Sequence, residues 1–226
     1  MRRLLFIMTL AATVAQAWAQ YDDEYKMEVG AGVGTSTYLG DFNGNITSGA
    51  QPLGALVLKR VINPYMGVAA QLAFGKLKGT SANVKTYYPE LQGEPYTFSN
   101  TVAGLDVRYE YNFWPYGTGR DYLGAKRLTP FVFGGLGLAY ADAGEAQIAL
   151  AMPLGMGVKY KVAPRLNLSL EWAMHFTNSD KLDGKADPYV IESTGLMKNS
   201  DGFSTLLFTL TYSFMPKCRV CHNADE

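Results

Sequence analysis

Several features that would assign this chain to a common class of protein are scarce or absent. Only 2 of the 226 residues are cysteine, which excludes a small fold held together by many disulfides. Lys+Arg and Asp+Glu both number 20, so there is no excess of positive charge to bind phosphates, and we expect no nucleic-acid partner. After the N-terminal segment there is no apolar run of about 18 residues, as a membrane-spanning helix would need. A β-rich protein remains, either soluble or a membrane barrel.

The N-terminus has the pattern of an export signal. Arg2 and Arg3 precede an apolar stretch, residues 4–14, that is too short to span a bilayer, and Ala-Trp-Ala at 17–19 fits a small-x-small cleavage site. No cysteine follows the cleavage position, so we expect no lipid anchor there. The expected parts are a signal peptide over residues 1–19, a barrel over residues 20–215 and a periplasmic C-terminal tail over residues 216–226.

A two-residue period dominates the rest of the chain, and sustained helical periodicity is missing. Apolar residues alternate with small or polar ones over stretches of roughly ten residues. The run 105–110, for example, reads Leu-Asp-Val-Arg-Tyr-Glu. The pattern predicts eight strands, at Met27–Leu39, Leu53–Ile62, Met66–Phe74, Val102–Phe113, Thr129–Ala141, Ile148–Val162, Leu166–Phe176 and 205–214.

The polarity of the two strand faces decides between a soluble barrel and a membrane barrel, which share the period but point opposite faces inward. The polar face carries too much charge for a dry interior that binds an apolar ligand. We therefore predict an all-β fold, an eight-stranded antiparallel transmembrane (outer-membrane) β-barrel, with the apolar face toward lipid. Because unpaired buried ions are costly, the interior charges should pair with one another. They are Glu28, Lys59, Asp106, Arg108, Glu110, Lys159, Lys161 and Glu171.

The spacing of the strands predicts long connections at one end and short turns at the other. The long connections are 40–52, 76–100, 142–147 and 177–202, and the tight turns are Asn63-Pro64 and Ala163-Pro164. Long loops outside and short turns inside are typical of outer-membrane barrels, so we expect both termini to be periplasmic. Aromatic residues predict a girdle at each interface. They are Tyr25, Tyr65, Phe113, Trp114, Tyr116, Tyr160 and Phe214 on the periplasmic side, and Tyr38, Phe74, Tyr140, Trp172 and Phe176 on the outside.

Glycine recurs at inward positions of the predicted strands. Gly155 and Gly157 are two such positions, and we expect them to admit bulky neighbours across a narrow barrel.

One periplasmic connection, residues 115–128, is too long for a simple turn and has more basic than acidic residues. Together with the C-terminal tail it is our candidate for docking a periplasmic partner, and the alternative is a solvated loop without a partner. The candidate docking residues are Arg120, Asp121, Tyr122, Lys126 and Arg127.

Three runs resemble a known family. They are RYEYNFWPY at 108–116, LTPFVFGGLG at 128–137 and the GVKYKxxPRLNL core within 155–168, and they are similar to the PorG-type outer-membrane β-barrels of Bacteroidota. The resemblance implies a component of the type IX secretion system, associated with the periplasmic ring built by the lipoprotein PorK and PorN. It carries no catalytic residues and implies no cofactor. The expected partners are thus PorK/PorN-like ring proteins and outer-membrane lipid, with no small-molecule substrate.

The C-terminal tail contains Cys218-Arg219-Val220-Cys221-His222, which matches the C-x-x-C-H pattern of c-type haem attachment. Too few residues follow the motif to cover a haem, and the tail supplies three ligands where a closed zinc site needs four. We expect a disulfide that involves Cys218 and Cys221, either with each other or with a partner.

An enzyme is the third possibility, because some eight-stranded outer-membrane barrels hydrolyse or transfer lipid A acyl chains with a His and a Ser two residues apart. Here His175 and Ser179 are four residues apart, so the register does not fit. We expect His175 to be an interior or rim residue held by hydrogen bonds. The predicted function is therefore a non-enzymatic membrane anchor of the secretion ring. The alternative is a stand-alone OmpA-like barrel with a role in adhesion or membrane integrity.

Overall fold

The computed structural model describes residues 24–39, 49–80, 97–117, 125–142, 146–179 and 202–216. All regular structure in these residues is β. The strands are β1 (Tyr25–Leu39), β2 (Gln51–Asn63), β3 (Met66–Thr80), β4 (Thr97–Asn112), β5 (Leu128–Asp142), β6 (Ala146–Ala163), β7 (Leu166–Thr177) and β8 (Gly202–Pro216). No helix that is long and apolar enough to cross a membrane occurs in the described part of the chain.

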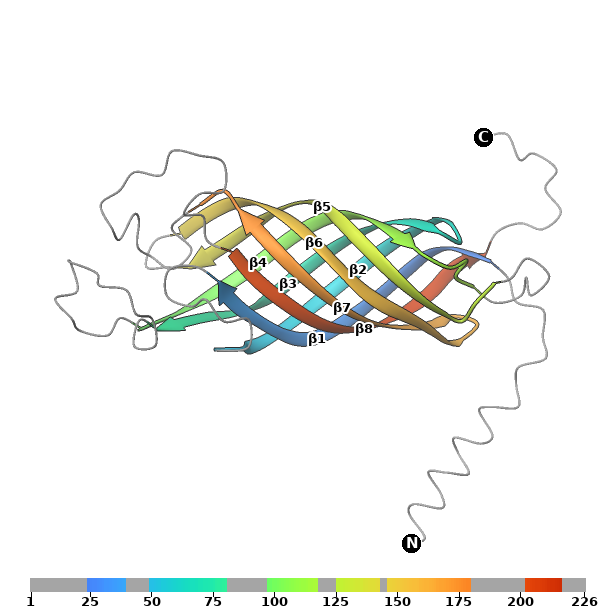
Figure 1. The fold of residues 1–226 in the computed structure, drawn as a ribbon, viewed down its shortest axis with the longest axis horizontal. Helices are drawn as coiled ribbons and strands as arrows, with labels where there is room; N and C mark the ends of the chain where they lie inside the picture. Colours follow the sequence, from blue (N-terminus) through green and yellow to red (C-terminus); the bar gives the residue numbers. More distant parts are fainter. Residues whose placement is uncertain are drawn as a thin grey trace, which may run out of the picture.

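The eight strands form one closed antiparallel barrel in sequence order (Figure 1). Each strand pairs with the next, and β1 pairs with β8 from Tyr25↔Pro216 to Leu39↔Gly202. The closure gives every strand two neighbours, so no sheet edge remains to be satisfied by water. The predicted fold class is confirmed.

The two ends of the barrel differ in their connections. At one end the strands are joined by residues 64–65, 113–127 and 164–165, and β1 begins and β8 ends there; we call it the short-turn end. At the opposite end, the long-loop end, the strands are separated by residues 40–50, 81–96, 143–145 and 178–201. The predicted alternation of short and long connections is therefore present with two exceptions, the long 113–127 connection and the short separation at 143–145.

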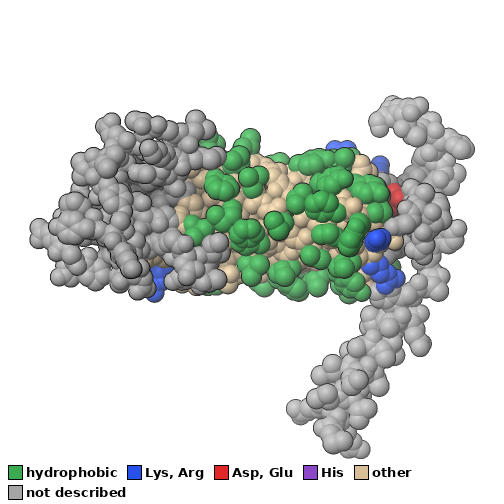
Figure 2. Space-filling model, in the orientation of Figure 1, with side chains coloured by type: hydrophobic (Ala, Val, Ile, Leu, Met, Phe, Trp, Pro, Cys, Tyr) green, Lys and Arg blue, Asp and Glu red, His purple; other side chains and the backbone are tan. Residues whose placement is uncertain are grey.

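The outer wall of the barrel is apolar. Leu136 is 72% exposed, Leu150 is 62% exposed and Val107 is 55% exposed, although all three lie in strands. Figure 2 shows hydrophobic side chains along the length of the wall, with Lys and Arg confined to the two ends of the face in view. Such a wall would be unfavourable in water and is suited to the hydrocarbon of a bilayer.

The strand bounds differ most from the prediction at the β3–β4 hairpin. The ladder continues through Lys76↔Thr101 and Lys78↔Ser99, so residues 76–80 and 97–100 belong to strands and not to the loop predicted over 76–100. Here the polarity of the faces is reversed, because Lys76 and Lys78 are exposed while Leu77 is fully buried. The reversal removed the pattern of apolar outward residues on which the prediction relied.

The interior is filled by side chains and has two parts. Toward the long-loop end it contains a cluster of apolar side chains, whereas the buried lysines and the carboxylates paired with them lie toward the short-turn end. The apolar part consists of Tyr38, Leu77, Phe98, Val102, Ala139, Ala151 and Phe203, which we call the apolar cluster.

Two tyrosines that the sequence assigned to lipid-facing girdles are located elsewhere. Tyr38 is fully buried in the apolar cluster, where its ring meets Phe98 edge-on at 5.0 Å between centroids. It lies where the inward and outward faces of β1 no longer alternate, since Ser36, Thr37 and Tyr38 are all buried. Tyr116 is half-buried, and its hydroxyl bonds Asn167 inside the barrel. Position near an interface therefore did not establish which way either ring points.

Candidate functional site

All eight charged residues assigned to the interior are buried in the structure. They come from five strands, namely β1 (Glu28), β2 (Lys59), β4 (Asp106, Arg108, Glu110), β6 (Lys159, Lys161) and β7 (Glu171). Each lies on the inward side of the two-residue alternation. Attraction between neighbouring opposite charges offsets the hydration that these ions lose on burial.

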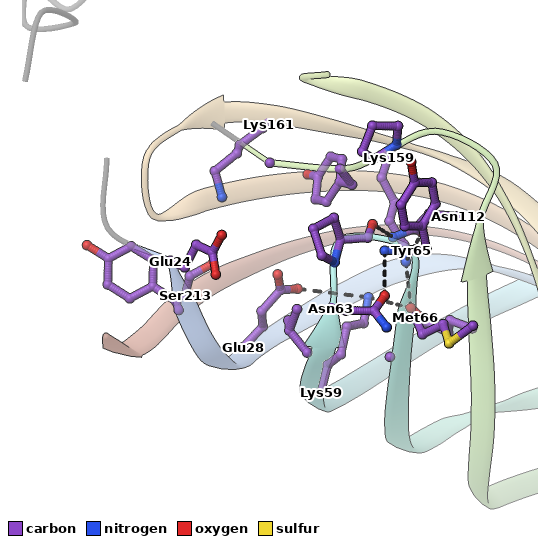
Figure 3. Close-up of a pocket in the computed structure, with 18 of the residues that line it drawn as sticks. Glu24, Glu28, Lys59, Asn63, Tyr65, Met66, Asn112, Lys159, Lys161 and Ser213 are labelled. Carbon is purple, nitrogen blue, oxygen red and sulfur yellow. Dashed lines mark hydrogen bonds and ion pairs between the residues drawn. The ribbon is translucent and has the colours of Figure 1, made fainter. Parts of the chain in front are cut away.

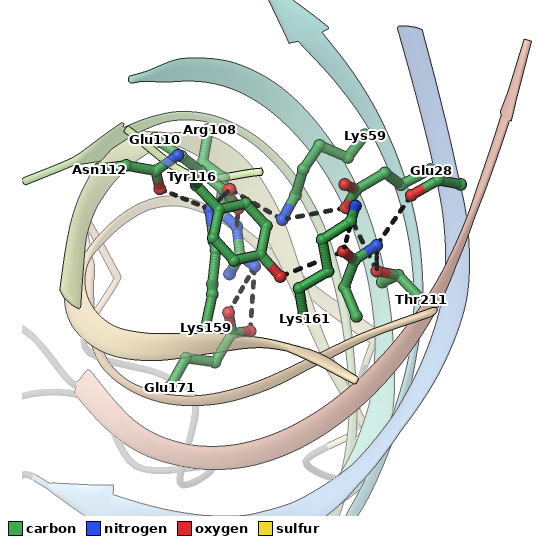
Figure 4. Close-up of polar contacts among 12 residues, drawn as sticks. Glu28, Lys59, Arg108, Glu110, Asn112, Tyr116, Lys159, Lys161, Glu171 and Thr211 are labelled. Carbon is green, nitrogen blue, oxygen red and sulfur yellow. Dashed lines mark hydrogen bonds and ion pairs between the residues drawn. The ribbon is translucent and has the colours of Figure 1, made fainter. Parts of the chain in front are cut away.

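Glu110 is the centre of this network (Figure 4). Its carboxylate lies 2.6 Å from Lys159 Nζ, 2.9 Å from Lys59 Nζ and 3.3 Å from Arg108 Nε. Lys59 and Lys159 belong to β2 and β6, neither of which is hydrogen-bonded to β4. The contacts therefore cross the lumen and join opposite parts of the wall.

Arg108 makes a second strong ion pair, with Glu171. Its Nη2 donates to both carboxylate oxygens, at 2.7 and 3.0 Å, and its guanidinium lies 4.3 Å from the centre of the Phe133 ring. Lys159 lies likewise 4.0 Å from the Phe131 ring. Each cation therefore has a favourable cation–π contact with a phenyl ring in addition to its ion pair.

Glycines opposite these rings make the packing possible. A Cβ at Gly157 would lie 2.7 Å from the Phe131 ring, and one at Gly155 would overlap the Phe133 ring. Both positions accommodate a bulky neighbour, as the sequence predicted.

Asn167 connects the network to the mouth of the barrel. Its amide nitrogen donates to Ser213 at 2.9 Å and to Thr211 at 3.3 Å, and its oxygen accepts from Tyr116 and Lys161. The alternation of β7 indicated that Asn167 points inward, but no sequence signal showed that it joins three strands and a connection.

Asp106 lies apart from the other charges, beside His175. The two are 3.9 Å apart from Oδ2 to Nδ1, and His175 Nε2 lies 3.2 Å from Thr205 Oγ1. The imidazole stacks on Phe203 at 4.3 Å. The prediction that His175 is an interior residue held by a hydrogen bond is confirmed.

Thr205, His175 and Asp106 follow one another as hydroxyl, imidazole and carboxylate, which is the order in the catalytic triad of a hydrolase. Asp106, His175 and Thr205 are each at least 95% buried, and Phe203 of the apolar cluster packs directly on the imidazole. The distance of 3.9 Å is too long for the carboxylate to orient the imidazole directly. In the described structure the three side chains are therefore packed in the barrel interior without the hydrogen-bonded geometry of a triad.

At the long-loop end a direct contact between β1 and β3 also narrows the described barrel. β2 begins only at Gln51, opposite Ser36, so β1 and β3 approach each other beyond it. Ser36 Oγ donates to the Lys76 carbonyl at 2.7 Å across this gap. With the apolar cluster beneath it, this contact draws the wall together at the long-loop end.

At the short-turn end the interior opens into a cavity of about 430 Å³ (Figure 3). Three lysines (Lys59, Lys159, Lys161) and three glutamates (Glu24, Glu28, Glu110) line it, together with residues of the β2–β3 turn and of the 113–127 connection. The ionisable side chains that line the cavity are thus equal in number of positive and negative charges. Among the described residues, no group of His, Cys, Asp and Glu is arranged to hold a metal ion.

The two ends of the 113–127 connection are fixed to the barrel beside this cavity. Tyr116 N donates to the Pro64 carbonyl at 3.0 Å, and Tyr116 pairs with Lys126 as an isolated parallel bridge. Burial and the nearby Glu28 carboxylate raise the pKa of the Tyr116 phenol. Tyr116 therefore stays neutral and closes part of the mouth.

Only part of the predicted docking surface lies within the described residues. Lys126 and Arg127 are exposed, and Lys126 Nζ lies 4.6 Å from the centre of the Trp114 ring. Arg120, Asp121 and Tyr122 lie outside the described residues, as do Cys218 and Cys221 and the predicted signal peptide. The described bases of the connection are thus held at the rim and directed away from the interior.

These observations define a class: a small, closed transmembrane β-barrel with the architecture of outer-membrane proteins, whose described interior is packed with side chains except for the cavity at the short-turn end. Within that class, the chain belongs to the family described as Domain of unknown function (DUF6089), whose model matches residues 2–223. No curated protein matches the chain.

Solved structures of small outer-membrane barrels are similar to this fold. Neisserial surface protein A has a TM-score of 0.51 at 15% sequence identity, covering 83% of this chain and 97% of its own. The attachment invasion locus protein Ail of Yersinia pestis has a TM-score of 0.47 at 11% identity, covering 84% and 99%. The N-terminal barrel of Pseudomonas aeruginosa OprF has a TM-score of 0.43 at 14% identity, covering 84% and 100%. The first similarity supports the fold, and none of them transfers a function.

Proposed function

We propose that this protein is a non-enzymatic outer-membrane anchor for a periplasmic secretion ring. In this proposal residues 1–19 direct export, the barrel inserts into the outer membrane with its short-turn end in the periplasm, and the ring proteins are PorK/PorN-like. The secretion role itself is taken from the resemblance of runs 108–116, 128–137 and 155–168 to PorG-type barrels.

The observation that carries the proposal is the 113–127 connection. Its ends are hydrogen-bonded to the β2–β3 turn and to each other, and they hold the exposed cations Lys126 and Arg127 at the rim. A fixed, basic surface below a closed barrel suits a docking platform better than it suits a channel or an enzyme. A basic platform implies an acidic face on the ring partner.

Co-purification from the native membrane in detergent tests the proposal. A Lys126→Glu, Arg127→Glu double variant reverses the charge of the described part of the platform without removing its backbone hydrogen bonds. The matched control is Lys76→Glu, Lys78→Glu, which makes the same charge change at the long-loop end. We expect the first variant to lose its ring partners and the control to retain them.

Two further results would decide against the anchor. If the unaltered protein purifies without any periplasmic partner, the stand-alone OmpA-like alternative is correct. If deletion of residues 216–226 combined with the Lys126, Arg127 reversal leaves the partners unchanged, the docking surface is elsewhere. The enzyme alternative requires that a His175→Ala strain have an altered lipid A mass spectrum, and we expect the spectrum of the parent.

A further inference from the structure

Arg165 forms an unusual surface group in the β6–β7 turn. Its carbonyl accepts from Ser213 N at 2.7 Å, which fixes the turn against β8. Its side chain extends over the outside of the wall, where Nε donates to the Tyr25 hydroxyl at 2.8 Å and Nη1 donates to the Tyr212 hydroxyl at 3.1 Å. Its guanidinium lies 5.1 Å from the centre of the Tyr25 ring. An exposed arginine is thus held in one position by two residues of two other strands.

This group has many hydrogen-bond donors and few acceptors. A guanidinium has five N–H groups, and the two tyrosines engage two of them. Within the described residues the other three have no protein acceptor, and neither do the hydroxyl protons of Tyr25 and Tyr212. The unsatisfied donors are located together at one exposed point, which is the arrangement that an oxyanion with several oxygens satisfies.

The positive charge of Arg165 is not neutralised by an ion pair with any carboxylate of the described residues. Glu24 and Glu28 line the cavity at the short-turn end, and Tyr25 lies at the edge of the same cavity. Hydrogen bonding to Tyr212 and Tyr25 raises the pKa of Arg165 above its already high ordinary value, so its charge is permanent.

The position of the group identifies the source of the anion. Tyr212 is 46% exposed on the lipid-facing side of β8, and Phe208 and Leu210 continue the apolar wall away from it. Arg165 therefore lies where the apolar wall ends, at the depth of lipid headgroups. Free phosphate has the same chemistry, but only a lipid would place acyl chains along this wall.

We propose that Arg165, Tyr25 and Tyr212 form a binding site for the phosphodiester of a phospholipid headgroup in the leaflet at the short-turn end. The guanidinium binds two phosphate oxygens, and the phenol hydroxyls donate to the same group. The two tyrosines hold the guanidinium in place before the lipid arrives, so little side-chain freedom is lost on binding. The site depends on the barrel spanning a membrane and not on the secretion role.

Lipid retention by the full-length protein tests the site. The protein is reconstituted in nanodiscs of phosphatidylcholine containing a minor fraction of phosphatidylglycerol, released into detergent, and examined by native mass spectrometry for bound phosphatidylglycerol. The variants are Arg165→Gln and the double variant Tyr25→Phe, Tyr212→Phe, which keeps both rings and removes only the hydroxyls. The matched control is Arg60→Gln, an exposed arginine at the same end.

We expect Arg165→Gln to lower phosphatidylglycerol retention about tenfold, as loss of a charge-assisted pair implies, and the tyrosine variant to lower it less. Arg60→Gln should retain lipid like the unaltered protein. Equal retention by all variants, or an equal loss in Arg60→Gln, would overturn the site. Complete displacement of the lipid by excess inorganic phosphate would show a free-anion site and overturn the lipid assignment. Heat-modifiable gel migration confirms that each variant is folded.

Discussion

At the scale of single residues, Glu110 has the largest role in the interior. It is 1% exposed and contacts three cations that come from β2, β4 and β6. Two of these cations have another carboxylate nearby, but Lys159 has none besides Glu110 among its ion pairs in the described residues. Removing the Glu110 charge would therefore leave a buried ammonium with neutral partners only.

Glu110→Gln should consequently lower the free energy of unfolding by about 3–5 kcal/mol, the usual cost of removing one partner from a buried ion pair. Urea titration of the barrel refolded in lipid vesicles measures the change. Glu28→Gln is the matched control, because Glu28 contacts a single cation at 3.9 Å. Equal losses in the two variants would contradict the central role of Glu110.

Tyr116 predicts a pH dependence. Because burial raises the pKa of its phenol above the ordinary value near 10, the folded state holds this proton more tightly than the unfolded state does. Its contribution to stability is complete below about pH 10 and is lost as the pH rises further, where the unfolded state binds fewer protons. The Tyr116→Phe variant has no phenol to ionise at this position. Its free energy of unfolding should therefore fall less than that of the unaltered protein between about pH 9 and about pH 11, the range around the ordinary tyrosine pKa.

Urea midpoints measured across this alkaline range test the expectation. Tyr65→Phe, a change at an exposed tyrosine of the neighbouring turn, serves as the control. Parallel alkaline losses in the unaltered protein and in Tyr116→Phe would show that Tyr116 is not closed into the mouth.

At the scale of the strands, side-chain size on the inward face sets how closely the wall can pack. Phe131 and Phe133 of β5 stack at 5.7 Å and lie opposite the glycines of β6. The Phe133 ring in turn packs against the Arg108 guanidinium, and the Phe131 ring packs against the Lys159 ammonium. Gly155 and Gly157 of β6 thereby make room for the two rings against which the two buried cations pack.

Gly155→Ala should destabilise the barrel by about 1–3 kcal/mol, because its new Cβ would overlap both the Phe133 ring and the backbone carbonyl of Trp172. Gly54→Ala is the matched control, since a Cβ there meets nothing within 4 Å. Urea midpoints of the two variants in the same vesicles provide the comparison. A tolerated Gly155→Ala would mean that the Phe133 ring and the β7 backbone at Trp172 both shift easily to admit the Cβ.

At the scale of the whole molecule, the distribution of polarity defines the environment that the protein needs. Ionised groups are enclosed toward one end of the lumen, an apolar cluster lies toward the other end, and the outer wall is apolar between its two ends. The arrangement is the reverse of a soluble barrel with an apolar interior and a polar surface.

Val107→Arg tests this reversal directly. Val107 is 55% exposed on the wall, and an arginine near the bilayer midplane costs about 2–4 kcal/mol. We expect a matching loss in the free energy of folding into vesicles, with little change for Lys76→Arg at the long-loop end. A Val107→Arg variant that folds as well as the unaltered protein would place this surface in water.

Strand number, strand order and the inward placement of all eight charges were predictable from the sequence, because alternation with period two is a local property of each strand. The reversed faces of residues 76–80 broke that local rule, and the prediction ended there too early. The interior position of Tyr38 was missed for a related reason, since three consecutive residues of β1 are buried at that point.

Which charges meet was decided only by the tertiary structure. Glu110 of β4 meets lysines of β2 and β6 across the lumen, and Arg165 meets tyrosines of β1 and β8 across the outer wall. Neither set of partners is adjacent in sequence or visible in a pattern within one strand. They become neighbours because closure of the barrel fixes the curvature and stagger of eight strands at once, and a single strand carries no information about either.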